Sequence, residues 1–441
     1  MKRKIWLLIA AMLAALLLNG CAMRTVDEMY SLPKRSEEYS HLQSAIDIAM
    51  AGLDYSAPVS GENQQTVQIV DLNGDGNEEY LVFAKGTSEK PLQILIFYQD
   101  EEGKAQITEI IASNGTAFEH VEYAQIDGKP GFELIVGRQV SNQLMRNVSV
   151  YSFATGRAEQ LLTAAYSRLL TCDMGGSDQS ELLLIQRGES DVDNAVAVLY
   201  RYRSKSMVRS LETKLSQPAG NIKRIMAGKL QCGTPAIYVA SSVDETAILT
   251  DILALKQDRF VNISFNPDPE NVVQTLRNYY VYADDVDEDG VLELPSLHAV
   301  RPVSANWMLE EEYVIRWYSV DLQGRETDKL YTFHNYGGGW FLRLDSAWAE
   351  RITVYQVGNT YAFSMWDEEF TEAEPVFTLY ALTGSDRENQ AKEDSRFALH
   401  TDEGVIYAAK TEAGAEAFGI DETYLVNSFQ MIHQDWKTGE T

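Results

Sequence analysis

Residues 67–83 read VQIVDLNGDGNEEYLVF, and the prediction of the fold begins from the pattern of this stretch. Two apolar, β-branched segments flank a polar loop that carries Asp71, Asn73, Asp75 and Glu79 within nine residues. Apolar runs on both sides of a loop rich in Asn, Asp and Gly predict strand, turn, strand. Because carboxylates so close together repel one another, the loop indicates either a bound counter-ion or a turn with solvated carboxylates.

The same order of strand, polar loop, acidic residue and strand recurs along the chain. The five loops, numbered 1 to 5 below, lie at 71–79, 125–133, 173–181, 228–236 and 285–293, with starts 48 to 57 residues apart. A nearly constant period of this size is typical of stacked units, because one small sheet cannot bury both of its faces alone.

The repeat therefore predicts an all-β fold, and for units of four short strands the natural assembly is a β-propeller. We expect it to cover residues 58–420, with repeats near 66, 120, 168, 223 and 280 and degenerate blades after them. Seven blades are preferred, with six as the alternative. The segment 404–410 is expected to close the ring by pairing with residues 60–70.

Helical patterns frame the predicted propeller. Residues 36–57 contain apolar side chains at helical spacing after a Ser-Glu-Glu start, which predicts a short N-terminal helix. Residues 421–441 return to a helical pattern over about 421–437, with Asp421 as the expected N-cap.

Loops 1 and 5 carry the donor pattern of a calcium site. Oxygens at loop positions one, three and five converge as such a loop winds, position seven offers a carbonyl, and a Glu closes the shell. The expected ligands are Asp71, Asn73, Asp75, Asn77 and Glu79 in loop 1, and Asp285, Asp287, Asp289, Val291 and Glu293 in loop 5. We expect one or two Ca²⁺ ions, and solvated turns are the alternative.

The predicted calcium sites differ from an EF-hand, and they are limited to loops 1 and 5. An EF-hand needs a Glu at loop position twelve and flanking helices, but this position holds Val82 and Ser296, and the flanks are strand-like. In loops 2 and 3, Lys129 and Ser177 replace the central acid, and loop 4 has no carboxylate. These three loops are expected to be turns without a metal ion.

The N-terminus predicts an exported protein. Lys2, Arg3 and Lys4 precede an apolar run from Ile5 to Leu18, which is too short to span a bilayer comfortably and is typical of a secretory signal. The following Leu-Asn-Gly-Cys resembles the lipobox of bacterial lipoproteins. This resemblance implies a signal peptide at 1–20, a lipidated Cys21, a tether at 21–35 and a location on the extracytoplasmic face of the cell membrane. The alternative is an ordinary signal peptide that is cut elsewhere.

Strand, D-x-N/D-x-D-G-x-x-E, strand, in tandem at this spacing, resembles the FG-GAP/VCBS repeats of integrin α-like β-propellers. With the lipobox, the whole resembles a VCBS-repeat lipoprotein of a Gram-positive bacterium. The resemblance implies a calcium-stabilised propeller used for adhesion or ligand binding at the cell surface. It covers residues 60–300 well, lacks a Phe-Gly/Gly-Ala-Pro signature, and does not by itself imply an activity.

The composition of the chain narrows the classes of partner and scaffold that are expected. The chain has 37 basic and 65 acidic residues and a net charge of −28, so nucleic acid is not an expected partner. Besides Cys21 only Cys172 and Cys232 remain, too few for a disulfide scaffold; they are interpreted as small buried residues, with pairing as the alternative.

The expected function is a binding or interaction module for a protein or a cell-wall glycan. No catalytic motif is present and no catalytic residue is predicted, but a hydrolase or lyase acting on a surface polysaccharide is the alternative, and a structural partner of an envelope complex is a third. All tryptophans of the mature chain follow residue 306: Trp307, Trp317, Trp340, Trp348, Trp366 and Trp436. They suit either an exposed recognition face or the packing between degenerate blades.

Overall fold

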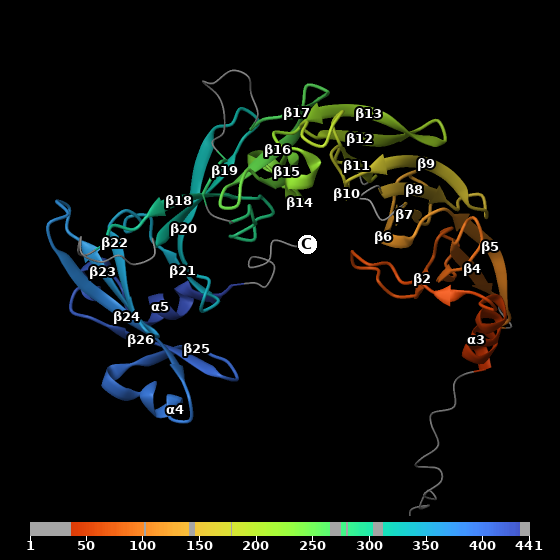
Figure 1. Cartoon of the computed structure of the whole chain (residues 1–441). Coiled ribbons are helices and arrows are strands. Elements are labelled where there is room, and N and C mark those ends of the chain that lie inside the picture. The colour runs from red at the N-terminus through yellow and green to blue at the C-terminus, as the bar shows by residue number, and fades with distance from the viewer. Residues whose placement is uncertain are drawn as a thin grey trace, which may run out of the picture.

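The computed structural model describes residues 37–100, 103–140, 146–177, 179–264, 275–278, 281–302 and 312–432. These residues form six antiparallel sheets of four or five strands, numbered here in chain order, and only short helices. The all-β prediction is therefore confirmed. The sheets follow one another along an arc with sheets 1 and 6 at its ends (Figure 1). Blade number and ring closure stay predictions.

Sheets 2 to 4 have their strands in chain order, whereas in sheet 1 the first two strands both pair with the third. Sheet 1 contains β1 (Asp54–Tyr55), β2 (Val67–Val70), β3 (Glu79–Lys85), β4 (Leu92–Gln99) and β5 (Ala105–Ser113). Sheet 2 contains β6 (Ala117–Ala124), β7 (Glu133–Gln139), β8 (Arg146–Ser152) and β9 (Glu159–Tyr166). Sheet 3 contains β10 (Arg168–Cys172), β11 (Glu181–Gln186), β12 (Val196–Arg203) and β13 (Ser206–Lys214). Sheet 4 contains β14 (Ile222–Lys229), β15 (Pro235–Ser242), β16 (Ile248–Lys256) and β17 (Arg259–Asn262).

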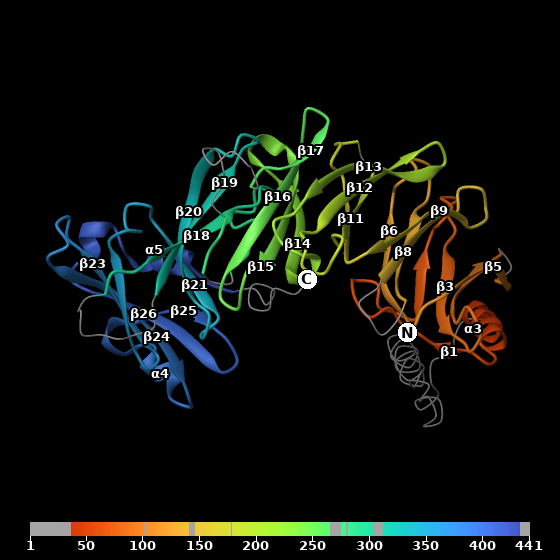
Figure 2. The ribbon, with the colours of Figure 1, turned by 45° about the horizontal axis from the view of Figure 1, so that its top comes forward.

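Sheets 5 and 6 have five strands each. Sheet 5 contains β18 (Leu294–Ala299), β19 (Tyr313–Val320), β20 (Glu326–Asn335), β21 (Trp340–Leu344) and β27 (Phe429–Met431). Sheet 6 has the spatial order β22 (Ile352–Val357), β23 (Thr360–Trp366), β24 (Ala373–Thr383), β26 (Val405–Thr411) and β25 (Phe397–Thr401). The α-helices are α3 (Glu37–Ala49), α4 (Arg387–Gln390) and α5 (Glu422–Ser428). Figure 2 shows the same succession of sheets, with α3 near one end and α4 near the other.

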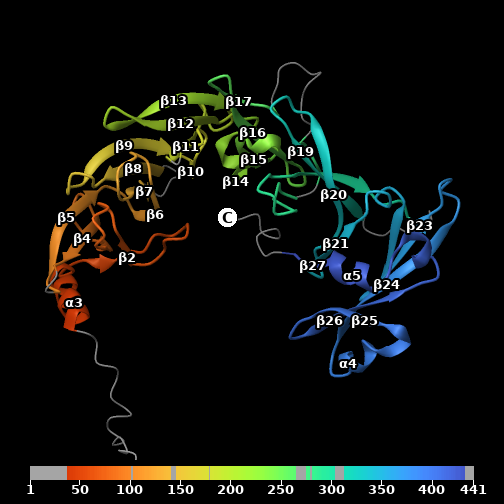
Figure 3. The ribbon, with the colours of Figure 1, turned by 180° about the vertical axis from the view of Figure 1, so that it is seen from behind.

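The first strands of sheets 2, 3 and 4, which are β6, β10 and β14, lie on the inside of the arc (Figures 1 and 3). The second strands β7, β11 and β15 are buried at nearly every position. Their sequences are continuous apolar runs because both faces of each sheet are covered by its neighbours. The repeat thus exposes the edges of its first strands on the inside of the arc.

A β-bulge recurs between the third and fourth strands of the repeat. It falls at Ile96/Phe97, Val150/Tyr151, Leu199/Tyr200 and Trp317/Tyr318. The extra residue on the fourth strand is Thr108, Leu161, Ser210 or Lys329 in turn. Bulges redirect a side chain out of the regular alternation, so these four residues occupy equivalent positions.

The N-terminal helix covers sheet 1. α3 and the turn after it bury Leu42, Ile46 and Met50 against Val82 and Phe97 of β3 and β4. The predicted helical segment 36–57 is therefore a helix only as far as Ala49, and β1 within it pairs with β3.

Two expectations about the C-terminal half are wrong. The segment 404–410 does not pair with residues 60–70, because both edges of β26 are already bonded to β24 and β25 in sheet 6. The C-terminal helix begins at the predicted cap, where Asp421 accepts the N–H of Tyr424 at 2.7 Å, but it ends at Ser428. The chain then forms β27, which completes the edge of sheet 5 along β21. Residues 433–441 lie outside the described residues.

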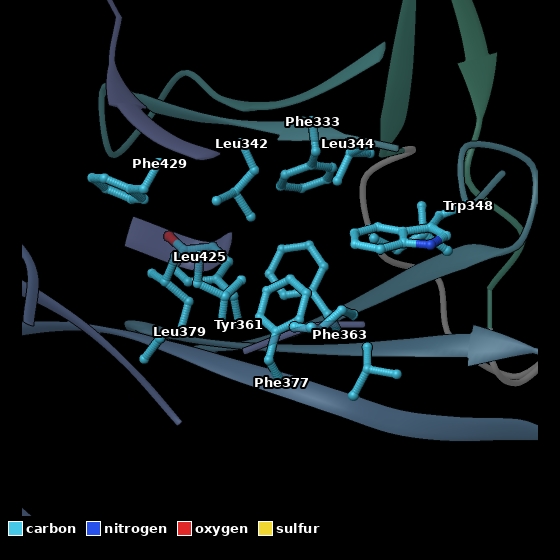
Figure 4. Packing of buried hydrophobic residues seen from close by; sticks show 14 of the residues in the cluster. Phe333, Leu342, Leu344, Trp348, Tyr361, Phe363, Phe377, Leu379, Leu425 and Phe429 are labelled. Atoms are coloured by element: carbon cyan, nitrogen blue, oxygen red, sulfur yellow. The ribbon is translucent and has the colours of Figure 1, made fainter. Parts of the chain in front are cut away.

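The four described tryptophans are buried. Trp317, Trp340, Trp348 and Trp366 all lie in the core, whereas Trp307 and Trp436 are outside the described residues. The core between sheets 5 and 6 is aromatic (Figure 4), and Phe333 of β20 packs edge-on against Phe363 of β23 with ring centroids 5.3 Å apart. Trp340 and Trp348 belong to this core, and Trp317 packs in a smaller cluster with Val281, Val286 and Ile315. None of the four buried side chains presents an exposed recognition face.

Replacing Phe333 by Ala should lower the free energy of unfolding by about 3–5 kcal/mol, because it leaves a cavity between two sheets that cannot close. Urea unfolding followed by tryptophan fluorescence measures the loss. The exposed Val357 is the control site, and V357A should cost less than about 0.5 kcal/mol. Equal, small losses in both variants would contradict the packing of sheet 5 on sheet 6.

Candidate metal centre

The five loops occupy one repeated position in the fold. Loop 1 joins β2 to β3 in sheet 1, loops 2 to 4 join the first and second strands of sheets 2 to 4, and loop 5 immediately precedes β18. Loop 5 is closed by a bridge between Asp284 and Glu293, whose backbones exchange hydrogen bonds of 2.7 and 3.1 Å. The sequence repeat is therefore a structural repeat at all five places.

A buried glutamate ends four of these loops. Glu79, Glu133, Glu181 and Glu293 are 6%, 3%, 9% and 0% exposed. Each accepts the backbone N–H of the apolar residue at loop position two, through the pairs Leu72–Glu79 at 2.8 Å, Ile126–Glu133 at 2.7 Å, Met174–Glu181 at 2.9 Å and Val286–Glu293 at 3.1 Å. The apolar partner is itself buried. This bond therefore anchors each loop to the core below it.

The first residue of the loop holds its backbone in shape. Asp71 accepts N–H groups from Gly74 at 2.7 Å and Gly76 at 2.9 Å, and Asp285 accepts N–H groups from Asp289 at 2.9 Å and Gly290 at 2.8 Å. Such bonds need an acceptor side chain that is short, which explains Asp at this position.

Neighbouring loops also bind one another. The N–H of loop position eight donates to a carbonyl of the preceding loop in three cases: Phe132 to Leu72 at 3.2 Å, Ser180 to Gln125 at 2.6 Å and Leu292 to Lys229 at 3.1 Å. Loops 1 and 2 approach so closely that a Cβ on Gly74 would lie 2.4 Å from the backbone of Gly131. The loops therefore form a contact chain that links consecutive sheets.

In three of the loops, a lysine or arginine side chain pairs with a loop carboxylate. In loop 2, Lys129 Nζ lies 2.7 Å from Asp127 Oδ2. In loop 3, Arg201 Nε from β12 lies 2.5 Å from Glu181 Oε1. In loop 5, Lys329 Nζ lies 2.5 Å from Asp289 Oδ2 and 3.5 Å from Asp287 Oδ2. An ammonium or guanidinium group thus offsets the negative charge in each of these loops.

Loop 5 has a donor set that fits a divalent cation. Carboxylate oxygens of Asp285, Asp287 and Asp289 lie within 4.8 Å of one another. Glu293 Oε1 is buried without a hydrogen bond, and Lys329 Nζ is 3.9 Å from it. Burial raises the pKa of Glu293 to about 8, an effect that Asp287 reinforces and Lys329 opposes. The bulge in β20 directs the side chain of Lys329 toward loop 5, so its ammonium group lies beside these oxygens.

Loop 1 has a similar donor set but no such cation. Within the described ranges, no lysine or arginine nitrogen forms an ion pair with Asp71, Asp75 or Glu79. The bulge residue equivalent to Lys329 is Thr108, and it lines a cavity of about 240 Å³ with Asn73, Asp75 and Glu79. Burial raises the pKa of Glu79, and the carboxylates of Asp75 and Asp71 raise it further. The carboxylates of loop 1 therefore lie beside a cavity without an ion pair to any described residue, although Arg157 lines the same cavity.

The structure gives other roles to some of the predicted ligands. Asn73 Nδ2 donates to Glu79 Oε1 at 2.9 Å, and the N–H groups of Asn77 and Val291 donate to Asp75 Oδ1 and Asp289 Oδ1 at 2.8 Å each. Coordination by the carbonyls of Asn77 and Val291 stays a prediction. The sequence signals Lys129 within its loop, but Arg201 and Lys329 lie 20 or more residues from the acids that they contact, so no local pattern reveals them.

Loop 4 differs from the others. It turns through a 3₁₀ segment, Gln231–Gly233, and Pro235 stands where the register of the other sheets places the glutamate. Leu230 keeps the buried apolar position. Cys232 is exposed in this turn, so the expectation that both cysteines are buried holds only for Cys172, and the two thiols are unpaired.

No protein-family model matches the chain, and no curated protein matches it. Among solved structures, the chain is similar to the rhamnogalacturonan lyase YesW, with 9% identity and a TM-score of 0.30 over 73% of this chain and 83% of that one. It is also similar to a protein from Lactobacillus plantarum, with 8% identity and a TM-score of 0.27 over 72% and 85% of the two chains. Similarities this weak assign neither a family nor a function.

Replacing Lys329 by Met should lower the free energy of unfolding in EDTA by about 1–2 kcal/mol, because Asp287, Asp289 and Glu293 then lack a partly buried counter-charge. In calcium, the same variant should gain more stability than the wild type. Thermal unfolding in both buffers measures these differences.

The matched control is Lys214→Met. Lys214 is exposed on β13 and forms no ion pair with any described residue, so this variant should behave as the wild type in both buffers. If K329M lost no stability in EDTA and gained nothing extra from calcium, Lys329 would not be the internal cation of loop 5.

Proposed function

We propose that the protein is a lipid-anchored, extracytoplasmic β-propeller that binds a protein or a cell-wall glycan and is stabilised by calcium. The six sheets would be its blades. The observation that carries the proposal is loop 1, where carboxylates cluster at the junction of two sheets without an internal cation. A scaffold of this kind is rigid and presents a broad surface, as a binding module requires.

Calcium suits loop 1 because the donors there are hard oxygens. Asp71, Asn73, Asp75 and Glu79 would hold the ion, with the carbonyl of Asn77 as a further ligand. The ion would supply positive charge to a corner where buried Glu79 faces Asp71 and Asp75. Because loop 1 also contacts loop 2, the ion would stabilise the junction of sheets 1 and 2.

Loop 5 would bind calcium more weakly than loop 1. Asp285, Asp287, Asp289 and Glu293 supply carboxylates, with the carbonyl of Val291 as a further ligand. However, an incoming ion must displace Lys329, whose Nζ already contacts Asp289 and Asp287. Occupancy of loop 5 is therefore expected only at higher calcium concentrations.

The binding role is supported by the inner surface of the arc. The strands β6, β10 and β14 meet there, with Val59 and Ser60 bonded along the edge of β6, and a cavity of about 670 Å³ lies among them. This volume falls within the range of small-molecule and sugar sites. Loops 1 and 5 would fix the sheets that carry this surface, so calcium would act on its shape rather than on a ligand directly.

Saturating calcium should raise the free energy of unfolding of the full chain by about 2.7 kcal/mol at a free concentration of about 100 times Kd. Calorimetric unfolding in EDTA and in calcium measures the difference. In Asp75→Asn the oxygen that accepts the Asn77 N–H remains but the charge is lost, so most of the calcium effect should disappear.

Asp244→Asn is the matched control, because Asp244 Oδ1 also accepts N–H groups within its own turn, from Thr246 and Ala247. D244N should keep the full calcium effect. Identical unfolding curves of the wild type in EDTA and calcium would reject the metal role.

The membrane anchor is tested by Cys21→Ser. In a cell that processes lipoproteins, the wild type should sediment with membranes, whereas the variant should move to the soluble extracytoplasmic fraction because a lipid thioether can no longer form. None of the helices in the described part of the chain is long and apolar enough to cross a membrane. Sedimentation of C21S with membranes as complete as that of the wild type would contradict anchoring through Cys21.

A further inference from the structure

A cavity lies on the inside of the arc, where three sheets and one N-terminal segment meet. Its volume is about 670 Å³, and its walls come from β6, β10, the start of β14 and residues 60–63. The N-terminal segment is fixed to β6, because Ser60 N donates to Glu119 O at 2.9 Å and Asn63 Nδ2 donates to Val121 O at 3.1 Å. Arg168 Nη2 ties β10 to β14 by donating to Ile222 O at 3.3 Å. Hydrogen bonds between its segments therefore hold the cavity wall in place.

The charge of this cavity differs from that of the chain. Basic side chains outnumber acidic ones in its lining: Arg146, Arg168, Lys223 and Arg224 against Glu62, Glu119 and Glu122. The whole protein, in contrast, carries a net charge of −28. Two of the acids are already engaged, since Glu119 Oε1 pairs with Arg146 at 2.9 Å and Glu122 Oε2 contacts His120 Nε2 at 3.2 Å.

Two arginines meet at one point of the wall. Arg146 Nη1 and Arg168 Nη1 each donate to the carbonyl of Ser167 at 3.1 Å. Their like charges therefore lie close together, and burial and the charge of Arg146 both lower the pKa of Arg168. The hydrogen bonds of Arg168 go only to the backbone carbonyls of Ser167 and Ile222, and no carboxylate of the described residues pairs with it. Arg168 is thus a partly buried positive charge without an ion pair among the described residues, and the carboxylate of Glu119 only partly offsets the lowering of its pKa.

We propose that this cavity is a binding site for the carboxylate or phosphate group of a small molecule or sugar residue, with Arg168 and Arg146 as the anion-binding side chains and Lys223 at the rim. Paired guanidinium groups match the planar and bidentate geometry of such anions. A locally positive cavity in an acidic protein also discriminates against neutral and cationic ligands. The proposal rests on the binding role proposed above and names its ligand class, but it does not depend on calcium.

Calorimetric titration of the full chain tests the proposal with two anionic probes and their neutral counterparts. Galacturonate and glycerol 3-phosphate are the anions, and galactose and glycerol are the controls. We expect an anion to bind at least tenfold more tightly than its neutral counterpart, with an affinity that falls as salt concentration rises. Binding of galacturonate alone identifies a sugar carboxylate as the ligand chemistry, and binding of glycerol 3-phosphate alone identifies a phosphate; either supports the proposal.

Variants locate the site. Arg168→Gln should weaken anion binding at least tenfold. Lys223→Gln, at an exposed position that folding does not require, should weaken it about threefold. Arg209→Gln is the control, because Arg209 lies on the outer strand β13 and pairs with Glu212, so its affinity should equal that of the wild type.

Two results would overturn the proposal: anions that bind no better than their neutral counterparts, or unchanged affinity in both R168Q and K223Q. The calcium effect on unfolding and the membrane fractionation of the same chain separate this failure from that of the broader function. If both of those hold while the anions do not bind, only the ligand class is wrong.

Discussion

A buried glutamate that accepts a backbone N–H from an apolar residue seven positions earlier holds four of the five loops onto their sheets. This interaction places a carboxylate where water cannot solvate it, at a cost of several kcal/mol unless a positive group or further donors compensate. The apolar residue fills the core at the same point, so the loop cannot shift to expose the carboxylate. Where the carboxyl stays ionised, a positive group at this corner compensates its charge; protonation is the alternative, because burial raises the pKa of Glu79, Glu133 and Glu293.

The chain provides that compensation differently from loop to loop. Lys129 comes from its own loop and pairs with Asp127 rather than with Glu133, Arg201 comes from the third strand of the sheet and pairs with Glu181, and Lys329 comes from a bulge on the fourth strand and pairs with Asp289. In loop 4 the acid itself is gone and Pro235 takes its place in the register. Loop 1 keeps its acids and has Thr108 at the bulge, and none of the described lysines and arginines pairs with these acids, although Arg157 lines the cavity beside them. This is where we propose that calcium binds. The loops therefore differ in which group balances the negative charge of their carboxylates.

The repeat, the strands that flank it and the helix at Glu37–Ala49 could be predicted from sequence, because their signals are local: apolar runs, Gly-rich turns and helical spacing. The charge partners could not, since β-sheet pairing brings Lys329 to Asp289 across 40 residues. The end of α5 was missed for the same reason, because the free edge of β21 draws Phe429–Met431 into a strand. The cluster of Arg146 and Arg168 likewise arises only when neighbouring sheets meet.

Anomalous diffraction from crystals of the full chain, grown at low millimolar calcium, would show whether calcium occupies loop 1 while Lys329 takes its place at loop 5. We expect an anomalous peak among the oxygens of Asp71, Asn73, Asp75 and Glu79, and none at loop 5, where Lys329 should remain against Asp289. A peak at loop 5 with Lys329 displaced, or no peak at loop 1, would contradict this expectation.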